Sequence, residues 1–148
     1  DDGALCCREH EGEDEVLSIC RRGQYDVHAL SRGLSPERKE KFFRPTHNPN
    51  MMAIDSRVKS MVEFRPMNLL GSYALMGRFD VIFCRNVLIY FSNDVKADIL
   101  RKLTMCLNPG GYLILGSTET LVGVADKYEM MRCNPGIIYH LKPQKYAF

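Results

Sequence analysis

The sequence lacks the cysteine patterns of a zinc finger or a redox pair. Its 148 residues include six cysteines, but no two of them form a Cys-x-x-Cys pair, and no histidine joins them at zinc-finger spacing. We therefore expect no metal site. Cys84 and Cys106 lie in apolar patterns, which predicts buried thiols, and a reducing cytoplasm is the simplest compartment for such a chain.

Long apolar runs and a strong net charge are also missing. No run approaches the roughly 18 residues that span a bilayer, so we expect no membrane insertion. The amino end is acidic and polar, unlike a signal peptide. A net charge of +2 is too mild to argue for a nucleic-acid partner. The length predicts one domain, or one domain with a small insert.

What the sequence does contain is a strand that ends in polar residues, within the stretch 79–91, FDVIFCRNVLIYF. The run 81–83 is branched or aromatic, as is typical of a strand buried on both faces of a parallel sheet. Arg85 and Asn86 then interrupt the apolar pattern. In an open α/β sheet, ligands bind at the carboxyl ends of the strands. The same residues also fit a core strand followed by a polar loop, and both interpretations stand at this point.

Periodicity and turn residues predict the other elements. Helices are expected at 15–22, 36–43 and 94–107, and strands near 52–55, 60–65, 79–83, 112–115, 128–132 and 137–141. The segment 25–32 is expected to be irregular, and Arg57 and Lys59 to lie on the solvated face of a hairpin. Residues 108–111, Asn-Pro-Gly-Gly, are expected to end the third helix. Strand, helix, strand and then an antiparallel pair predict an α/β fold with a mostly parallel sheet and a C-terminal antiparallel hairpin.

Taken together, these segments resemble the chemotaxis receptor methyltransferase (CheR) family, whose members use S-adenosylmethionine (SAM) to methylate glutamates of chemoreceptors. The stretch 79–91 is similar to the family signature nearly residue for residue. The stretch 108–121, NPGGYLILGSTETL, is similar to the next block of the family, where Gly-x-Ser-Glu-x-Leu is usual. Residues 68–70, Asn-Leu-Leu, fall where the family has its Asn-Leu. The resemblance covers roughly residues 15–141.

The resemblance implies a fold, a cofactor and a partner. The fold is a partial Rossmann-like SAM-methyltransferase sheet with a small antiparallel insert. Residues 1–24 and 60–148 would form the SAM-methyltransferase-like domain, and residues 25–59 a small α+β insert subdomain that docks a receptor tail in some members. SAM is the implied cofactor, with S-adenosylhomocysteine as its product. A chemoreceptor or another signalling protein is the implied substrate.

The resemblance also implies site residues. Asn68 and Leu69 would lie beside the adenine end of SAM, and Arg85 and Asn86 would contact SAM at the carboxyl end of the central strand. Tyr90 would lie close to the transferred methyl group and is the implied catalytic residue. From the residues alone, Asn68 also fits a cap or turn position, and Tyr90 also fits a core aromatic whose hydroxyl reaches a partner.

The implied reaction requires little acid–base catalysis from the protein. A free glutamate has a pKa of about 4.3 and is already ionised near neutral pH, so no general base is needed. The site instead has to hold the reacting atoms about 3–3.5 Å apart and to exclude water. The sulfonium is a cation that favours an aromatic face, which Tyr90 or Phe91 can supply.

The chain departs from the family pattern at its amino end. The family's first strand, its Gly-containing turn, the acid that binds the SAM ribose and an early Arg near the substrate should all precede Glu15. Only fourteen residues do so. These parts are therefore expected to be missing from the chain.

This departure leaves two hypotheses open. In the first, the chain is a SAM-dependent protein-glutamate O-methyltransferase. In the second, it is a truncated or degenerate CheR-like domain that is catalytically inactive and acts as a binding or oligomerising signalling module. Such a module would self-associate through the sheet edge that the missing strands expose. A nucleotide-dependent dehydrogenase is disfavoured, because the Gly-x-Gly-x-x-Gly turn and its downstream acid are absent.

Overall fold

The computed structural model describes residues 13–134 and 136–143. The chain divides into two compact units, residues 1–69 and residues 70–148, and each is described by itself. Among the described residues, no helix combines the length and the apolar character that crossing a membrane requires.

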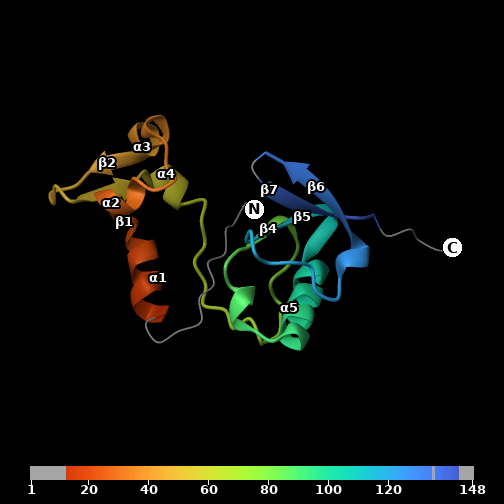
Figure 1. The fold of residues 1–148 in the computed structure, drawn as a ribbon. Coiled ribbons are helices and arrows are strands. Elements are labelled where there is room, and N and C mark those ends of the chain that lie inside the picture. The colour runs from red at the N-terminus through yellow and green to blue at the C-terminus, as the bar shows by residue number, and fades with distance from the viewer. Residues whose placement is uncertain (1–12, 135, 144–148) are drawn as a thin grey trace. The chain divides into compact units, whose positions relative to one another are not determined.

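The first unit contains a small antiparallel sheet among short helices (Figure 1). Its elements are α1 (Glu13–Arg22), β1 (Gln24–Asp26), α2 (Val27–Leu30), α3 (Pro36–Phe42), β2 (Phe43–Pro45), β3 (Met51–Ile54) and α4 (Ser56–Lys59). The strand order is β1-β3-β2, and both pairings are antiparallel. The expected small antiparallel sheet is therefore present.

Local chemistry explains where these helices begin and end. Gly23 has a φ of 69°, which suits glycine, and its N–H closes the end of α1 on the Ile19 carbonyl at 3.0 Å. Ser35 caps α3, because its hydroxyl accepts a hydrogen bond from the Arg38 N–H at 3.3 Å. Asp55 caps α4 by accepting from the Arg57 N–H at 2.9 Å. The Arg57 guanidinium bonded to this carboxylate helps to lower the pKa of Asp55 to about 2.

Three expectations for this unit are wrong. The segment 60–65 is not a strand, because the cap at Asp55 starts α4 at Ser56 and the chain leaves the helix in a turn. Arg57 and Lys59 therefore lie on α4 and not on a hairpin. The segment 25–32 is not irregular either, since it contributes to β1 and forms α2. The three-residue strands β1 and β2 carry too little alternation to be found from periodicity, whereas the strand expected near 52–55 is present as β3.

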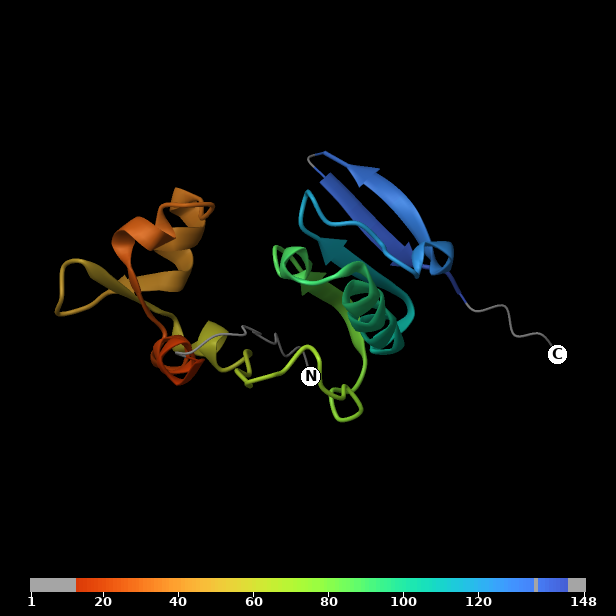
Figure 2. The same cartoon turned by 60° about the horizontal axis from the view of Figure 1, so that its bottom comes forward.

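The second unit holds a four-stranded sheet (Figures 1 and 2). Its elements are β4 (Phe79–Cys84), the 3₁₀ helix η1 (Leu88–Tyr90), α5 (Asn93–Met105), β5 (Leu107–Leu115), the 3₁₀ helix η2 (Ala125–Lys127), β6 (Tyr128–Cys133) and β7 (Gly136–Leu141). The strand order is β4-β5-β7-β6. β4 and β5 are parallel, whereas the pairings of β7 with β5 and with β6 are antiparallel.

These pairings confirm the α/β class and the C-terminal hairpin. The sheet is mixed, however, and one of its three described pairings is parallel, a smaller share than the sequence predicted. The stretch 108–111 does not form a loop after the helix. α5 already ends at Met105, and residues 108–111 belong to β5, where the register with β4 shifts between Phe79 and Val81.

The helix α5 packs against one face of this sheet (Figure 2). Ile99 and Leu100 are fully buried, as is Leu113 on the central strand β5. The Thr104 hydroxyl of α5 lies 2.8 Å from the Tyr128 hydroxyl of β6, so this buried polar pair is satisfied, and burial raises the pKa of Tyr128. On the outer side of α5, Asp98 and Lys102 form an ion pair at 2.7 Å.

The expectation that β4 is buried on both faces is wrong. Cys84 is buried as expected, but Val81 is 43% exposed and Phe83 is 71% exposed. Successive side chains of a strand point to opposite faces, and α5 covers one of them. Val81 and Phe83 lie on the other face, beside Tyr112 and Ile114 of β5. An apolar run predicts a buried strand but cannot show which layer is present to cover it.

Truncation of the core at Leu113 should destabilise the second unit. Leu113→Ala removes a side chain with no exposed surface, and we expect a loss of about 2–5 kcal/mol in the free energy of unfolding. Urea denaturation followed by circular dichroism measures this loss. Leu75→Ala is the matched control, because Leu75 is 95% exposed and its truncation should change the free energy by less than about 0.5 kcal/mol. Equal losses in both variants would contradict the assigned core.

Candidate functional site

The parallel pairing of β4 and β5 brings two loops together at one edge of the sheet. Cys84, the last residue of β4, is the partner of Leu115, the last residue of β5. Arg85 and Asn86 follow β4, and Gly116 follows β5. This is the edge at which open α/β sheets bind ligands, and it is where the sequence placed its polar residues.

Asn86 turns the chain sharply after β4. Its φ is 59°, and it is the one non-glycine residue with a positive φ in the described part of the chain. Asparagine tolerates this left-handed conformation better than most residues do. Val87 then returns to the right-handed region, with a φ of −117° and a ψ of −44°. Such a change of hand lets successive backbone N–H groups converge on one point.

The carboxylate of Glu119 lies where these N–H groups converge. Its Oε1 accepts from the N–H groups of Val87 at 3.0 Å and Leu88 at 2.7 Å. Its Oε2 accepts from the N–H groups of Asn86 at 2.9 Å and Gly116 at 2.7 Å. Glu119 is only 7% exposed, so the four bonds form largely out of contact with water. Hydrogen bonds to a charged acceptor are stronger than those between neutral groups.

Gly116 is fitted closely against this network. A Cβ at this position would lie 2.6 Å from Glu119 Oε2 and 2.7 Å from Asn86 Oδ1. Both distances are shorter than heavy atoms tolerate, so a larger residue would displace the carboxylate or the turn. The other end of the turn is held by Leu88, which is 1% exposed. The turn after β4 is thus fixed from both sides.

The structure brings three of the five predicted site residues together on this one loop. Arg85 and Asn86 are exposed at the carboxyl end of β4, and Tyr90 lies at the end of η1 with 76% of its surface exposed. Tyr90 is therefore not a core aromatic. Asn68 and Leu69 belong to the first unit, where Asn68 is exposed and Leu69 is buried. Their closeness to Asn86 stays a prediction.

Glu119 is the residue that sequence reasoning missed. The sequence resembles the family block around it, Gly-x-Ser-Glu-x-Leu, but this resemblance predicted no role for the acid itself. Its four partners are backbone groups, and three of them lie 31 to 33 residues earlier in the chain. Because Glu119 bonds to backbone N–H groups, the sequence contains no basic or polar partner residue that would point to its role. The one usable signal was an acid in a loop that follows a strand.

An open hollow of about 420 Å³ lies beside this edge. Its lining includes Arg85, Ser117 and Glu119 from the two loops, and Asn134 and Ile137 from the C-terminal hairpin. The hollow thus combines charged and polar groups of the two loops with a hairpin side that carries both Asn134 and the apolar Ile137. Ligand sites commonly combine an apolar wall with a few polar groups that fix orientation.

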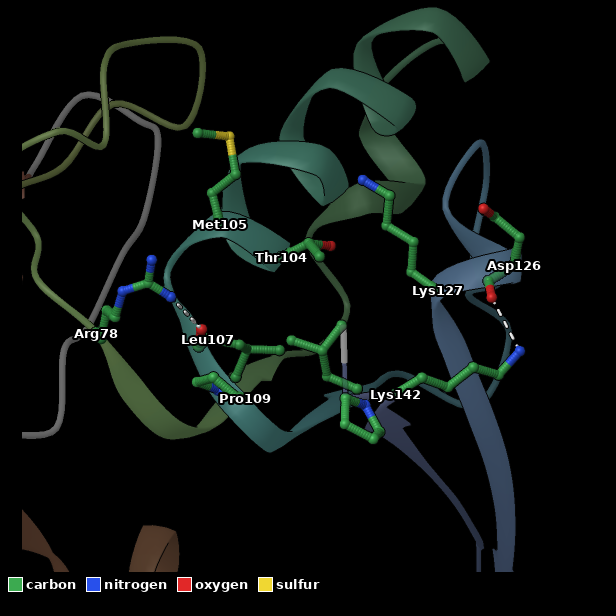
Figure 3. Close-up of a pocket in the computed structure, with 10 residues that line it drawn as sticks. Arg78, Thr104, Met105, Leu107, Pro109, Asp126, Lys127 and Lys142 are labelled. Atoms are coloured by element: carbon green, nitrogen blue, oxygen red, sulfur yellow. Dashed lines mark hydrogen bonds between the residues drawn. The ribbon is translucent and has the colours of Figure 1, made fainter. Parts of the chain in front are cut away.

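A larger hollow, of about 690 Å³, lies at the opposite end of the sheet. Figure 3 shows Arg78 and Lys142 at its rim, each bonded to a backbone carbonyl: Arg78 to Leu107 at 3.0 Å and Lys142 to Asp126 at 2.9 Å. It lies at the amino ends of β4 and β5, and no predicted site residue lines it. The smaller hollow, which lies beside the polar turn after β4, is therefore the better candidate for a ligand site.

Within the described residues, no group of three or more His, Cys, Asp and Glu side chains could hold a metal ion. An organic cofactor is the better match for the exposed side chains of Arg85 and Asn86. The backbone of Asn86 is held by Glu119, and the side chains of Arg85 and Asn86 are exposed and accessible to a ligand.

Comparison with known proteins identifies similar sequences. A family model described as CheR methyltransferase, SAM binding domain, matches residues 11–137. A chemotaxis protein methyltransferase of Vibrio parahaemolyticus is 58% identical over 127 residues, which cover 86% of this chain and 46% of the relative. Chemotaxis protein methyltransferase 1 of Pseudomonas aeruginosa is 50% identical over the same shares of the two chains. The Escherichia coli chemotaxis protein methyltransferase is 36% identical over 110 residues, 72% of this chain and 38% of the relative.

Substitution of Gly116 should disturb the turn after β4. In Gly116→Ala the added methyl group meets Glu119 Oε2 and Asn86 Oδ1, and we expect a loss of about 1–3 kcal/mol in the free energy of unfolding. The amide resonances of Asn86 and Val87 should shift in nuclear magnetic resonance spectra. Ser117→Ala is the control, because Ser117 is exposed and adjacent. Unchanged amide positions in Gly116→Ala would refute the close fit.

Proposed function

Because the chain belongs to the CheR methyltransferase family, we propose that it is part of an enzyme that transfers a methyl group from SAM to glutamate carboxylates of chemoreceptors. The resemblance drawn from the sequence is confirmed at the level of the family, and SAM is the cofactor that the family indicates. The names of the relatives support the activity and a chemoreceptor substrate. Both are proposals here, because the match spans 46% of the Vibrio relative.

The single observation that carries the proposal is the fixed polar turn at the carboxyl end of β4. Its backbone is held by Glu119, and its side chains Arg85 and Asn86 are exposed. A site that binds a flexible cofactor gains from such preorganisation, since less ordering is left to occur on binding. We propose that these two side chains contact SAM, and that Asn68 and Leu69 supply contacts to its adenine end.

SAM would bring the methyl group on a positively charged sulfur. The side chains of this chain then have to orient the cofactor and keep water away, because the substrate carboxylate is already ionised near neutral pH. Tyr90 is proposed to lie near the sulfonium. Tyr90 is 76% exposed and lies on the same loop as Asn86, so its aromatic ring is accessible to a cation.

The proposal also extends to organisation and location. Residues 25–59 are proposed to act as an insert subdomain within a SAM-methyltransferase-like domain of residues 1–24 and 60–148. The relatives are chemotaxis methyltransferases, which supports a place in the cytoplasm, beside the cytoplasmic parts of receptors.

The proposed function predicts that the 148-residue chain binds SAM and S-adenosylhomocysteine in isothermal titration calorimetry. Asn86→Gly keeps the left-handed backbone accessible while removing the side chain, so it should weaken binding by about tenfold if the amide contacts SAM. Arg85→Ala should weaken binding by a similar factor, for loss of its contact.

Arg101→Ala is the control for Arg85→Ala. Arg101 lies on the outer side of α5, where it pairs with Asp98 at 2.5 Å, and exposed ion pairs of this kind contribute little. The affinity of the Arg101→Ala variant for SAM should equal that of the unchanged chain. Absence of a heat signal from the unchanged chain at millimolar ligand would rule out SAM binding by these residues.

A second candidate function rests on the edge of the sheet. In the described part of the chain, β4 has one strand neighbour, β5, and its other edge carries backbone groups that can pair with another strand. Phe83 adds an exposed apolar side chain there. These features support a module that self-associates through β4, with or without methyl transfer.

Self-association through β4 should weaken when a charge is placed on this strand. Phe83→Lys should lower the dimer fraction in sedimentation-velocity runs at increasing protein concentration, because an edge charge opposes strand pairing. Met130→Lys is the matched control: Met130 is 53% exposed and lies on β6, at the opposite edge of the sheet. A monomer at all concentrations that binds SAM would exclude this second function.

A further inference from the structure

We infer that Glu119 is a positioning residue for the cofactor site: its carboxylate sets the conformation in which the Arg85–Asn86 turn presents its side chains. This inference rests on the proposed function, because it takes the turn to be part of the SAM site. Glu119 is among the residues that line the hollow, but both of its carboxylate oxygens are engaged by backbone N–H groups. It is largely buried and acts through the backbone of residues 86–88 and 116.

The first step of the argument is that Glu119 is committed to the backbone. Each carboxylate oxygen accepts two N–H groups, between 2.7 and 3.0 Å. Among the described residues, Glu119 takes part in no ion pair, so its charge is balanced by these N–H dipoles. An anion held by successive N–H groups of a turn is the internal counterpart of a bound phosphate or carboxylate ligand.

The second step is that the turn needs this anion. Asn86 is held in the left-handed region, which an L-residue occupies at a cost, and three consecutive N–H groups point to one place. Without an acceptor there, partly buried donors would be left unsatisfied. The turn would relax to another conformation, and the side chain of Asn86 would then leave its present direction.

The third step is that the residues proposed to meet SAM flank the anchored backbone. Arg85 comes directly before the three bonded N–H groups, and Tyr90 comes two residues after the last of them. The same carboxylate also holds Gly116 at the end of β5. One side chain therefore fixes both loops of the carboxyl edge, and its loss should affect ligand binding at that edge before it affects the distant core.

The inference predicts the behaviour of Glu119→Gln. The shape of the side chain is kept, but its amide group would direct N–H donors at backbone N–H donors, so at most one oxygen can keep its bonds. We expect faster hydrogen exchange at the amides of Asn86, Val87, Leu88 and Gly116. If the turn keeps its conformation for a tenth of the time, the apparent dissociation constant for SAM rises about tenfold.

Glu129→Gln is the matched control, because the Glu129 side chain is 70% exposed on β6. Hydrogen exchange at the four amides and affinity for SAM should both stay unchanged in this variant. A second variant, Glu119→Ala, tests the role of charge. It leaves an empty acceptor site, which excess formate should fill, restoring slow exchange and SAM affinity, whereas neutral formamide should not.

The outcomes separate the inference from the proposed function. If the unchanged chain binds no SAM, the proposed function fails, and the hydrogen-exchange measurements still decide whether Glu119 holds the turn. If Glu119→Gln folds and binds SAM as the unchanged chain does, the inference is overturned. If the variants do not fold, exchange in the unchanged chain decides: the four amides should be protected despite their exposed neighbours, and rapid exchange would overturn the inference.

Discussion

The carboxyl edge of the sheet depends on one buried carboxylate. Glu119 accepts four backbone N–H groups from two loops that are far apart in sequence and adjacent in space. A buried charge is costly unless its hydrogen bonds are satisfied, and here the backbone satisfies all of them. The arrangement is reciprocal: the turn solvates the anion, and the anion holds the turn. Neither would keep its present geometry without the other.

This arrangement requires the parallel pairing of β4 and β5. Only parallel neighbours end at the same edge, so only they bring the loop after Cys84 beside the loop after Leu115. The helix α5 connects the two strands and packs against one face of them, through Ile99 and Leu103. The core of the second unit thereby sets the distance between the two loops. The site draws its rigidity from this strand–helix–strand unit.

Sequence patterns predicted the elements with strong local signals. α5 has a continuous apolar stripe, and the hairpin of β6 and β7 has a clear turn between two apolar runs, so both were found. The strands β1 and β2 were missed because their pairing partners are distant and each strand is very short, whereas β3 was predicted to within one residue. Arg85 and Asn86 were found as an interruption of an apolar run. Glu119 was missed because its partners are backbone atoms, which look alike in every sequence.

The open face of β4 lies next to the polar turn that follows this strand. An apolar strand in an α/β sheet gains most when both faces are covered, yet Phe83 is 71% exposed in the described structure. Phe83 lies two residues before Arg85, so a layer packed on this face would end beside the turn. A segment that buries Phe83 would therefore also lie beside the proposed cofactor site. Covering this face would then also help to keep water away from the proposed site, whose turn is held by Glu119.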